Sequence, residues 1–256
     1  MKKRVISLIL IFTLLLTLVP VMPGTVQTKV KAASWNGTTK TEPVKEGEVY
    51  QISSAEELAW FAEHVNDRIA ENKAAEKYEV VVENAVLTDD IDLGDQEWTP
   101  ISMTDYATIA FAGSFDGQNH TVSGLKIQTS AKNYGLFGLV NGGTIKNLKA
   151  EGKVESNNAV GGMIGLLQTG TVENCSMSGS VISTGTGTKG YAGGIAGSIV
   201  AKDAVVKGCS NSADISGSYA GGILGCNNKT NAPTVISDCY NTGFITGTTR
   251  SGGIAG

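Results

Sequence analysis

Short apolar runs, separated by glycine and polar residues, recur along the second half of the chain. The run Tyr191–Gly197 returns as Tyr219–Gly225, and looser copies begin at Tyr134, Val160 and Ser251. Their final glycines stand at positions 138, 165, 197, 225 and 256, so the copies are 27, 32, 28 and 31 residues apart. A repeat of this length is typical of solenoids, propellers and arrays, in which each unit buries the apolar face of its neighbour.

The segments between the glycine-rich stretches predict strands. Thr144–Leu148 and Thr171–Cys175 are short β-branched runs of the kind found in strands. Two or three such strands per repeat, paired in parallel from coil to coil, would stack like side chains in ladders. Propeller blades are longer than this repeat, and the hexapeptide regularity of a left-handed β-helix is absent. We therefore predict an all-β fold, a parallel β-helix or β-solenoid.

Upstream of the repeats, one segment has a helical period. Two overlapping pairs, Ser53 with Glu56 and Ser54 with Glu57, have the spacing of a capping box. The apolar positions that follow at i, i+3, i+4 and i+7 are Leu58, Phe61, Ala62 and Val65. We predict one α-helix that caps the open N-terminal end of the solenoid.

The other segments before the repeats complete the expected organisation. Residues 33–48 are rich in Lys, Thr, Glu and Gly and predict an extended leader. From Tyr78 the period becomes two, with Tyr78, Val80 and Val82 alternating with other residues as in a strand. We assign residues 49–133 to the cap and first coils and residues 134–256 to the repeats.

The first residues predict export. Residues 2–4 are basic, residues 5–21 are almost wholly apolar, and residues 30–32 offer a small-x-small cleavage site. We therefore predict that residues 1–32 are a secretory signal peptide. The alternative is an uncleaved membrane anchor, but the apolar run is shorter than the roughly 20 residues that span a bilayer.

Charge then narrows the classes of partner. The chain has 20 basic and 24 acidic side chains, and removal of residues 1–32 takes away five basic and no acidic ones, which leaves a net charge of −9. This acidity disfavours a nucleic-acid partner. After signal cleavage no remaining segment is apolar and long enough for a membrane span. We expect the mature protein to be secreted or held at the cell surface.

Cysteine positions follow the repeat. Cys175, Cys209 and Cys239 occupy the slot that Leu148 fills one coil earlier, which predicts a buried core ladder of unpaired thiols. Two disulfides are the alternative for an exported chain, but parallel side-chain vectors on stacked coils do not suit disulfide geometry. Cys226 lies outside this register and has no assigned role.

The Gly-Gly-Ile-x-Gly unit resembles the GLUG motif of exported bacterial proteins, and the first copy, Tyr134-Gly135-Leu136-Phe137-Gly138, fits it best. The upstream segments Ala55–Phe61, Asp90–Leu93, Trp98–Ile101 and Phe115–Gly117 resemble those that precede such repeats in Firmicute surface proteins. The resemblance covers about residues 48–256. It implies a β-helix and a cell-surface context, as in adhesin-like proteins and in accessory regions of IgA-specific metallopeptidases.

Metal and acid–base chemistry find little support in the residue pattern. His64 and His120 lack the paired ligands of a metallopeptidase, and we expect both to be solvated. The acidic run at 89–97 offers Asp90, Asp92 and Asp95 as calcium candidates, with a solvated acidic turn as the alternative. We expect no cofactor and no catalytic residue within the chain.

Aromatic residues offer another kind of site. Tyr134, Tyr191 and Tyr219 stand just before the glycines of their copies and predict a ladder. It would either be exposed, as a contact strip for a glycan or protein of the host or cell wall, or half-buried and stabilising. Val160 and Ser251 are assigned to the same slot.

These patterns predict an exported, non-catalytic repeat module that acts as a cell-surface spacer or adhesion platform. One alternative is the accessory N-terminal region of a longer secreted enzyme, a metallopeptidase or a carbohydrate-active enzyme. Another is a β-helical enzyme that cleaves sugars on its own face, although the lysines Lys146, Lys153 and Lys207 look scattered among the repeats. Because copies two to four continue beyond their glycines, we expect the solenoid to be incomplete at Gly256.

Overall fold

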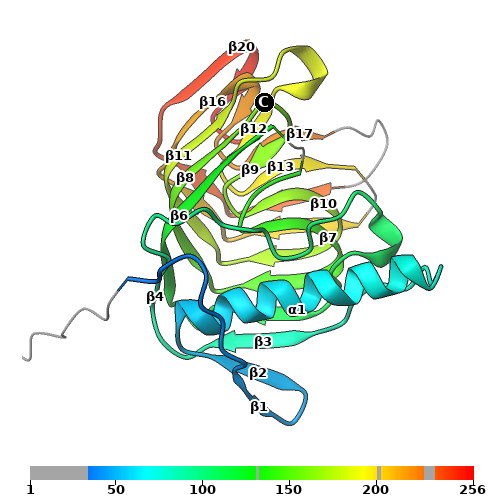
Figure 1. Cartoon of the computed structure of the whole chain (residues 1–256). Helices are drawn as coiled ribbons and strands as arrows, with labels where there is room; N and C mark the ends of the chain where they lie inside the picture. Colours follow the sequence, from blue (N-terminus) through cyan, green and yellow to red (C-terminus); the bar gives the residue numbers. More distant parts are fainter. Residues whose placement is uncertain (1–33, 131–132, 201–202, 228–233) are drawn as a thin grey trace, which may run out of the picture. The chain divides into compact units, whose positions relative to one another are not determined.

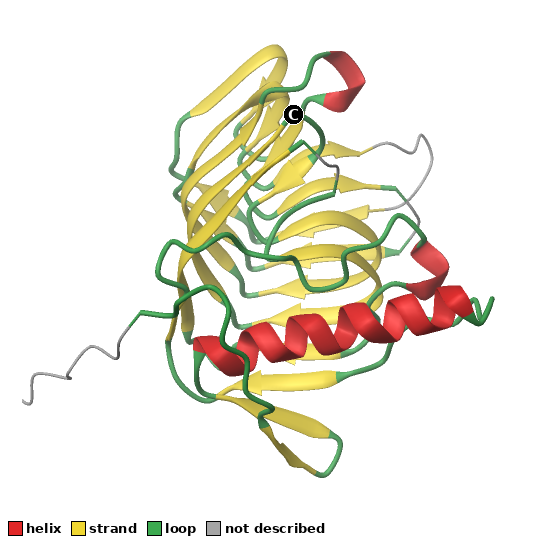
Figure 2. Cartoon of the chain, in the orientation of Figure 1, coloured by secondary structure: helices red, strands yellow, loops and turns green. Residues whose placement is uncertain are grey.

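The fold is a parallel β-solenoid with one long α-helix, as Figure 2 shows. The computed structural model describes residues 34–130, 133–200, 203–227 and 234–256. The predicted signal peptide, residues 1–32, lies outside the described residues. Among the described residues every strand pair except β1–β2 is parallel, so the predicted fold class is confirmed.

Two sheets form the walls of the solenoid, and each coil contributes strands to both (Figure 1). The first wall contains β1 (Val44–Glu46), β2 (Val49–Ile52), β3 (Asn84–Leu87), β5 (Ser114–Asp116), β7 (Phe137–Lys146), β10 (Ile164–Glu173), β13 (Ala196–Ile199), β14 (Ala204–Lys207), β17 (Leu224–Asn227) and β18 (Thr234–Ser237). The second wall contains β4 (Ile91–Asp92), β6 (Thr121–Thr129), β8 (Lys149–Ser156), β9 (Val160–Gly161), β11 (Ser176–Ser183), β12 (Tyr191–Gly193), β15 (Ser210–Asn211), β16 (Asp214–Gly221), β19 (Tyr240–Asn241) and β20 (Ile245–Gly252). Single 3-10 turns lie at Ala107–Ile109 and Gly187–Lys189.

The chain passes from the first wall to the second at a sharp corner. One residue there has a left-handed backbone in each of four coils: Asn147 (φ 50°), Asn174 (φ 52°), Gly208 (φ 61°) and Asp238 (φ 54°). Glycine, asparagine and aspartate are the residues that tolerate this conformation best. The amide of Asn174 donates to Asn147 Oδ1 at 3.3 Å, and that of Asn147 donates to Asp116 Oδ1 at 3.0 Å, so successive corners are linked.

The slot after each corner points into the core. Leu148, Cys175 and Cys209 are buried, and Cys239 in the outermost coil is half-buried. The backbone bonds Ser176 N to Leu148 O and Ser210 N to Cys175 O, both 2.9 Å, stack these slots directly. All four cysteines lie in the described residues, and none of them forms a disulfide. Burial raises the pKa of Cys175 and of Cys239 and so disfavours their reactive thiolate forms.

We expect alkylation to separate the four thiols. In the folded protein iodoacetamide should modify Cys226 and Cys239, which are half-buried, well before Cys175 and Cys209. In urea all four should react at similar rates, because unfolding removes the burial. Mass spectrometry of timed samples measures this, and equal rates for Cys175 and Cys226 in the folded protein would contradict the core ladder.

A column of alternating charge runs along the outside of the first wall. Asp116 pairs with Lys146, and Glu173 lies between Lys146 and Lys207 in the ladder. Lys146 Nζ lies 3.2 Å from Asp116 Oδ2, and Lys207 Nζ lies 3.0 Å from Glu173 Oε1. Two of the three lysines that look scattered in the sequence are therefore stacked beside carboxylates.

Asp116 makes this column sensitive to acid. Partial burial alone would raise the pKa of Asp116, but hydrogen bonds from Asn147, Gln118 and Lys146 outweigh it and hold the pKa below its ordinary value of 3.8. The stabilisation is therefore complete above pH 3.8 and is lost as the pH falls through the folded-state pKa. When the pH is lowered below 3.8, the urea midpoint of the wild type should decrease, and that of Asp116→Asn should decrease less. Parallel losses would refute this role for Asp116.

The predicted helix is α1 (Ala55–Ala74), and its N-cap is Ser54, the second of the two serines that the sequence offers. Ser54 Oγ accepts from Glu57 N at 3.3 Å, as in a capping box, and Glu57 Oε2 accepts from Ser53 N at 2.6 Å, one residue before the cap. Its apolar face is buried, and Phe61 packs on Phe111 and Phe115 in the core of the first coils, with centroids 6.5 and 6.0 Å away. The edge of the first wall is closed separately by β1, a short strand with exposed side chains.

Two segments before the repeats differ from expectation. Residues 34–48 contain β1, and Trp35 is buried against Trp98 at a centroid distance of 6.1 Å, so this stretch is packed onto the coils and is no simple extended leader. Residues 78–83 form no strand. Val81 is buried and makes an isolated parallel bridge to Phe111, whereas Tyr78 is 70% exposed and Val82 is 61% exposed. The reason is that β3 starts later, at Asn84, where pairing with β2 begins.

Candidate functional site

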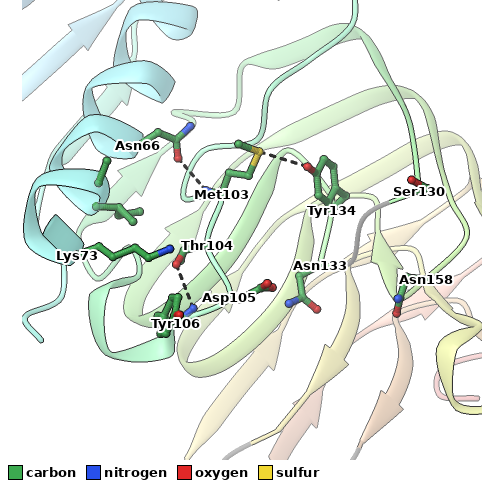
Figure 3. A pocket seen from close by; sticks show the side chains of 12 residues that line it. Asn66, Lys73, Met103, Thr104, Asp105, Tyr106, Ser130, Asn133, Tyr134 and Asn158 are labelled. Carbon is green, nitrogen blue, oxygen red and sulfur yellow. Dashed lines mark hydrogen bonds between the residues drawn. The ribbon is translucent and has the colours of Figure 1, made fainter. Parts of the chain in front are cut away.

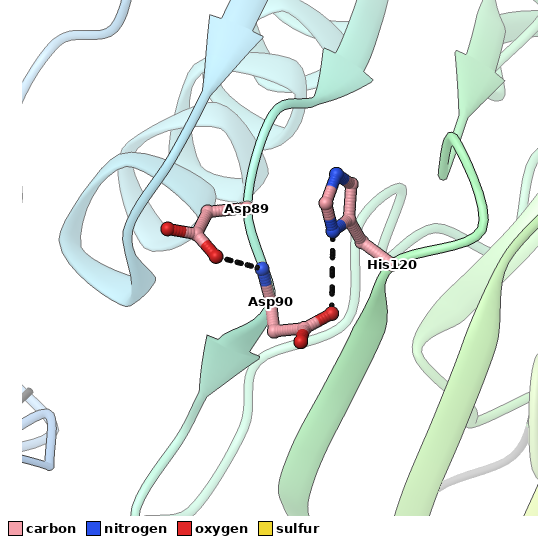
Figure 4. Close-up of side chains that lie close together, drawn as sticks. All are labelled: Asp89, Asp90 and His120. Atoms are coloured by element: carbon pink, nitrogen blue, oxygen red, sulfur yellow. Dashed lines mark hydrogen bonds and ion pairs between the residues drawn. The ribbon is translucent and has the colours of Figure 1, made fainter. Parts of the chain in front are cut away.

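The predicted calcium residues do not converge. Asp92 Oδ1 accepts from Gly94 N at 2.9 Å, within its own turn, and Asp95 is exposed with φ 56°. Asp90 Oδ1 instead accepts from Thr121 N at 3.0 Å and lies 3.2 Å from His120 Nδ1. Among the described residues, the group of acidic, histidine or cysteine side chains whose ligand atoms come together is Asp89, Asp90 and His120 (Figure 4).

This group is a corner contact between two neighbouring coils. Asp89 Oδ1 caps the backbone N–H of Asp90 at 2.8 Å, and Asp90 links to the start of β6. The side chain of Asp90 is 60% exposed and that of His120 is 31% exposed. Exposed carboxylates that already accept backbone hydrogen bonds are common without a bound ion, so the geometry supports a structural contact.

His64 is more enclosed than the sequence predicts. Its ring stacks on Trp60 at a centroid distance of 4.8 Å, and its Nε2 lies 3.3 Å from Glu83 Oε1 and 3.4 Å from Tyr50 Oη. The side chain is 25% exposed, so it is a packed histidine on the flank of α1 and not a solvated one. The contacts tie α1 to β2 and to the segment before β3.

The tyrosine ladder has two members. Tyr191 pairs with Tyr219 across β12 and β16, with the rings 5.3 Å apart and edge to face. Arg250, and not Ser251, lies opposite Tyr219, with Arg250 Cζ 5.8 Å from the ring centroid. Tyr191 is buried, and burial first, then Cys226 and Tyr219, raises the pKa of Tyr191 to about 12. Cys226, which has no assigned role in the repeat pattern, lies beside this phenol. Burial raises the pKa of the Cys226 thiol, and the hydrogen bond with Tyr191 offsets only part of this increase.

Tyr134 belongs to a different column. It is in register with Val160, which in turn pairs with Ala192, one position past Tyr191. Tyr134 and Val160 directly precede a glycine, whereas an alanine separates Tyr191 and Tyr219 from the glycines of their copies. The phenol of Tyr134 reaches Met103 instead and donates to its Sδ at 3.3 Å. The predicted three-tyrosine ladder, with Val160 and Ser251 in the same slot, is therefore wrong in its register.

Tyr134 lies at the side of a groove with a volume of about 690 Å³. Figure 3 shows its walls: α1 with Asn66 and Lys73, the loop from Met103 to Tyr106, and the opposite side with Asn133, Tyr134 and Asn158. The groove therefore lies where the helical cap meets the first two repeat copies. Its volume is within the range of about 300–1,000 Å³ that is typical of ligand pockets.

Hydrogen bonds hold the loop of this groove in place. Asn66 donates from Nδ2 to Pro100 O at 3.0 Å and its Oδ1 accepts from Met103 N at 2.7 Å. The helix therefore holds the backbone at both ends of the segment 100–103. Ser102 is fully buried with φ 66°, and its Oγ accepts from Phe111 N at 2.9 Å. Tyr106 N donates to Thr104 Oγ1 at 3.0 Å. These bonds organise the loop without a ligand.

The sequence pattern did not indicate this groove. Asn66, Ile69 and Lys73 share one helix face through their i, i+3 and i+7 spacing, which is a readable signal. The Met103–Tyr106 loop has no period and no motif, so nothing in the sequence brings it to that face.

These features define the class of the protein: a parallel β-solenoid with a helical cap, a stacked core and a groove beside the cap. Residues 156–182 match the model of the GLUG motif, and this range contains the second copy of the repeat, so the chain carries a GLUG repeat.

A solved structure with the same fold is that of a putative immunoglobulin A1 protease from Bacteroides ovatus. It is 22% identical, with a TM-score of 0.58 over 81% of this chain and 61% of that one. At this identity the likeness shows the fold, and the chain spans less than two thirds of that structure. No curated protein matches the chain.

A membrane-spanning helix is not found in the described part of the chain, where no helix is both long and apolar enough to cross a bilayer.

Proposed function

We propose that the chain is an exported, non-catalytic repeat module that acts as a spacer or adhesion platform at a bacterial cell surface. The observation that carries this proposal is the continuous pair of hydrogen-bonded walls, in which β7, β10 and β13 and likewise β8, β11 and β16 stack as parallel strands. Because each coil is fixed to its neighbours along both walls, the repeats hold a defined spacing and present their outward side chains in rows.

Three further observations support export. Residues 1–32 have the pattern of a signal peptide, and the GLUG resemblance is to exported proteins. The fold is shared with a protein whose name refers to an extracellular immunoglobulin, which agrees with a location outside the cell.

The test is to express the full chain with a C-terminal epitope tag in a Gram-positive host. We expect a mature protein cut near Ala32 that is found in the medium or is digested when intact cells are treated with protease. A matched variant with Lys2, Lys3 and Arg4 replaced by glutamate should stay inside the cell. Wild-type protein that remains intracellular and uncut would refute the proposal.

A second candidate is an accessory region of a longer secreted enzyme. The observation that favours it is that the structural match covers 81% of this chain but 61% of the other, so that protein has a further part outside the shared fold. Incubation of the chain with human immunoglobulin A1 tests whether the chain itself is a protease. The spacer and the accessory region are both non-catalytic. Both predict intact immunoglobulin, and cleavage products would overturn both.

A further inference from the structure

We propose that the groove between α1 and the Met103–Tyr106 loop, called here the cap groove, binds a neutral oligosaccharide. The inference rests on the proposed function, because it gives the adhesion platform a site and a class of ligand. It does not involve the predicted ladder, since Tyr191 is buried and Tyr219 faces Arg250.

The aromatic side chains of the cap groove supply the first argument. Tyr106 is 48% exposed and Met103 is 47% exposed, while Tyr134 lies half-buried on the other side. Large apolar side chains gathered in a concave surface mark a binding site more often than single exposed ones do. A pyranose ring presents a flat face of C–H groups that can lie on a tyrosine ring, while the phenol bonds to hydroxyls.

The polar side chains supply the second argument. Asn158 Oδ1 accepts from Ala159 N at 2.9 Å, which leaves its amide N–H groups to donate. The backbone of Asn133, with φ 62°, is held by its bond to Ala159 O at 3.0 Å, and its side-chain amide makes no hydrogen bond within the described residues. Amides both donate and accept, and so do sugar hydroxyls, so two amides on one side match a row of hydroxyls.

Charge decides between classes of glycan. Among the described residues that line the groove, Lys73 is the one cation and Asp105 is the one anion. Lys73 Nζ lies 4.9 Å from the centroid of Tyr106, so its charge is directed at that ring. A sulfated or uronic acid polymer would meet no cluster of cations among these described residues, and the same holds for nucleic acid. The balance therefore favours an uncharged sugar.

Preorganisation is the third argument. The Asn66 bridge and the buried Ser102 fix the loop, and the Tyr134–Met103 contact joins the two sides. Because these bonds exist without a ligand, little conformational freedom is lost on binding.

The experiment uses the full mature protein with maltotriose, cellotriose and triacetylchitotriose as probes, measured by saturation-transfer NMR and calorimetry. We expect at least one trimer to bind, and Tyr106→Ala and Asn133→Ala each to weaken it at least tenfold. Tyr240→Ala is the matched control: Tyr240 is 61% exposed in the outermost coil, and its loss should leave binding unchanged. Circular dichroism should show all three variants folded.

The outcomes separate the site from the function. Binding that Tyr106→Ala and Asn133→Ala leave intact, or binding of an extended peptide but of no sugar, would overturn the cap groove as a glycan site. Normal export with no trimer bound would overturn the site and leave the proposed function standing. Binding with release of shorter sugars would support the site and overturn the non-catalytic function.

Discussion

Replacing Gly194 with alanine should lower the free energy of unfolding by about 3 kcal/mol. A Cβ at this position would lie 2.2 Å from Gly222 O and 2.4 Å from Asn211 Oδ1. The carbonyl belongs to the next coil, and Asn211 is anchored by bonds from its Nδ2 to Ala213 O at 2.9 Å and to Asn241 Oδ1 at 2.7 Å. Neither atom is the free end of a flexible side chain, so the coils themselves must move apart.

Gly253→Ala is the matched control for this prediction. Gly253 holds the same place in the last copy, and a Cβ there would meet nothing within 4 Å. We expect its unfolding free energy to stay within about 0.5 kcal/mol of the wild type. Urea unfolding followed by circular dichroism measures both variants. If the two lose the same stability, the second glycine of the motif is not needed for close contact between coils.

Replacing Phe61 with alanine should cost about 3–5 kcal/mol and loosen the helical cap. Phe61 is fully buried and stands between α1 and the aromatic core of the first coils. Phe111 and Phe115 also contact Phe137, at centroid distances of 5.7 and 5.3 Å, so loss of the Phe61 ring leaves a cavity at the end of a connected cluster. Amide hydrogen exchange in residues 55–74 should therefore accelerate more than in the repeats.

Phe244→Ala tests whether the effect depends on burial. Phe244 is 81% exposed in the outermost coil, so we expect a change within about 0.5 kcal/mol. If exchange in α1 stayed at the wild-type rate in Phe61→Ala, the helix would be held by other contacts, such as those of Trp60 and His64.

The cap groove gives these stability predictions a functional consequence. Its loop is held by Asn66 of α1, and its opposite side comes from the start of the repeats. A variant that loosens α1, such as Phe61→Ala, should therefore also weaken sugar binding. The groove depends on the docking of the cap and on the register of the first repeats at the same time.

The repeat by itself determined the architecture of this protein. Glycine-flanked runs about 30 residues apart predict parallel coils, and the shared slot of Leu148, Cys175 and Cys209 predicts a stacked interior. The capping serine Ser54 and the apolar stripe behind it likewise predict α1. These features depend on local spacing, and a solenoid repeats its local spacing in every coil, so the pattern carries the fold.

Only the tertiary structure decided what lies side by side across irregular segments. Register places Tyr134 outside the tyrosine column, because Tyr134 directly precedes its glycine, whereas Ala192 and Ala220 separate Tyr191 and Tyr219 from theirs. The loop around Met103 has no period, and its position depends on Asn66, 37 residues earlier in the chain. His120 meets Asp90 for a similar reason, since neighbouring coils bring together residues 30 positions apart. Long-range contacts of this kind are set by how whole coils pack, which local residue patterns do not specify.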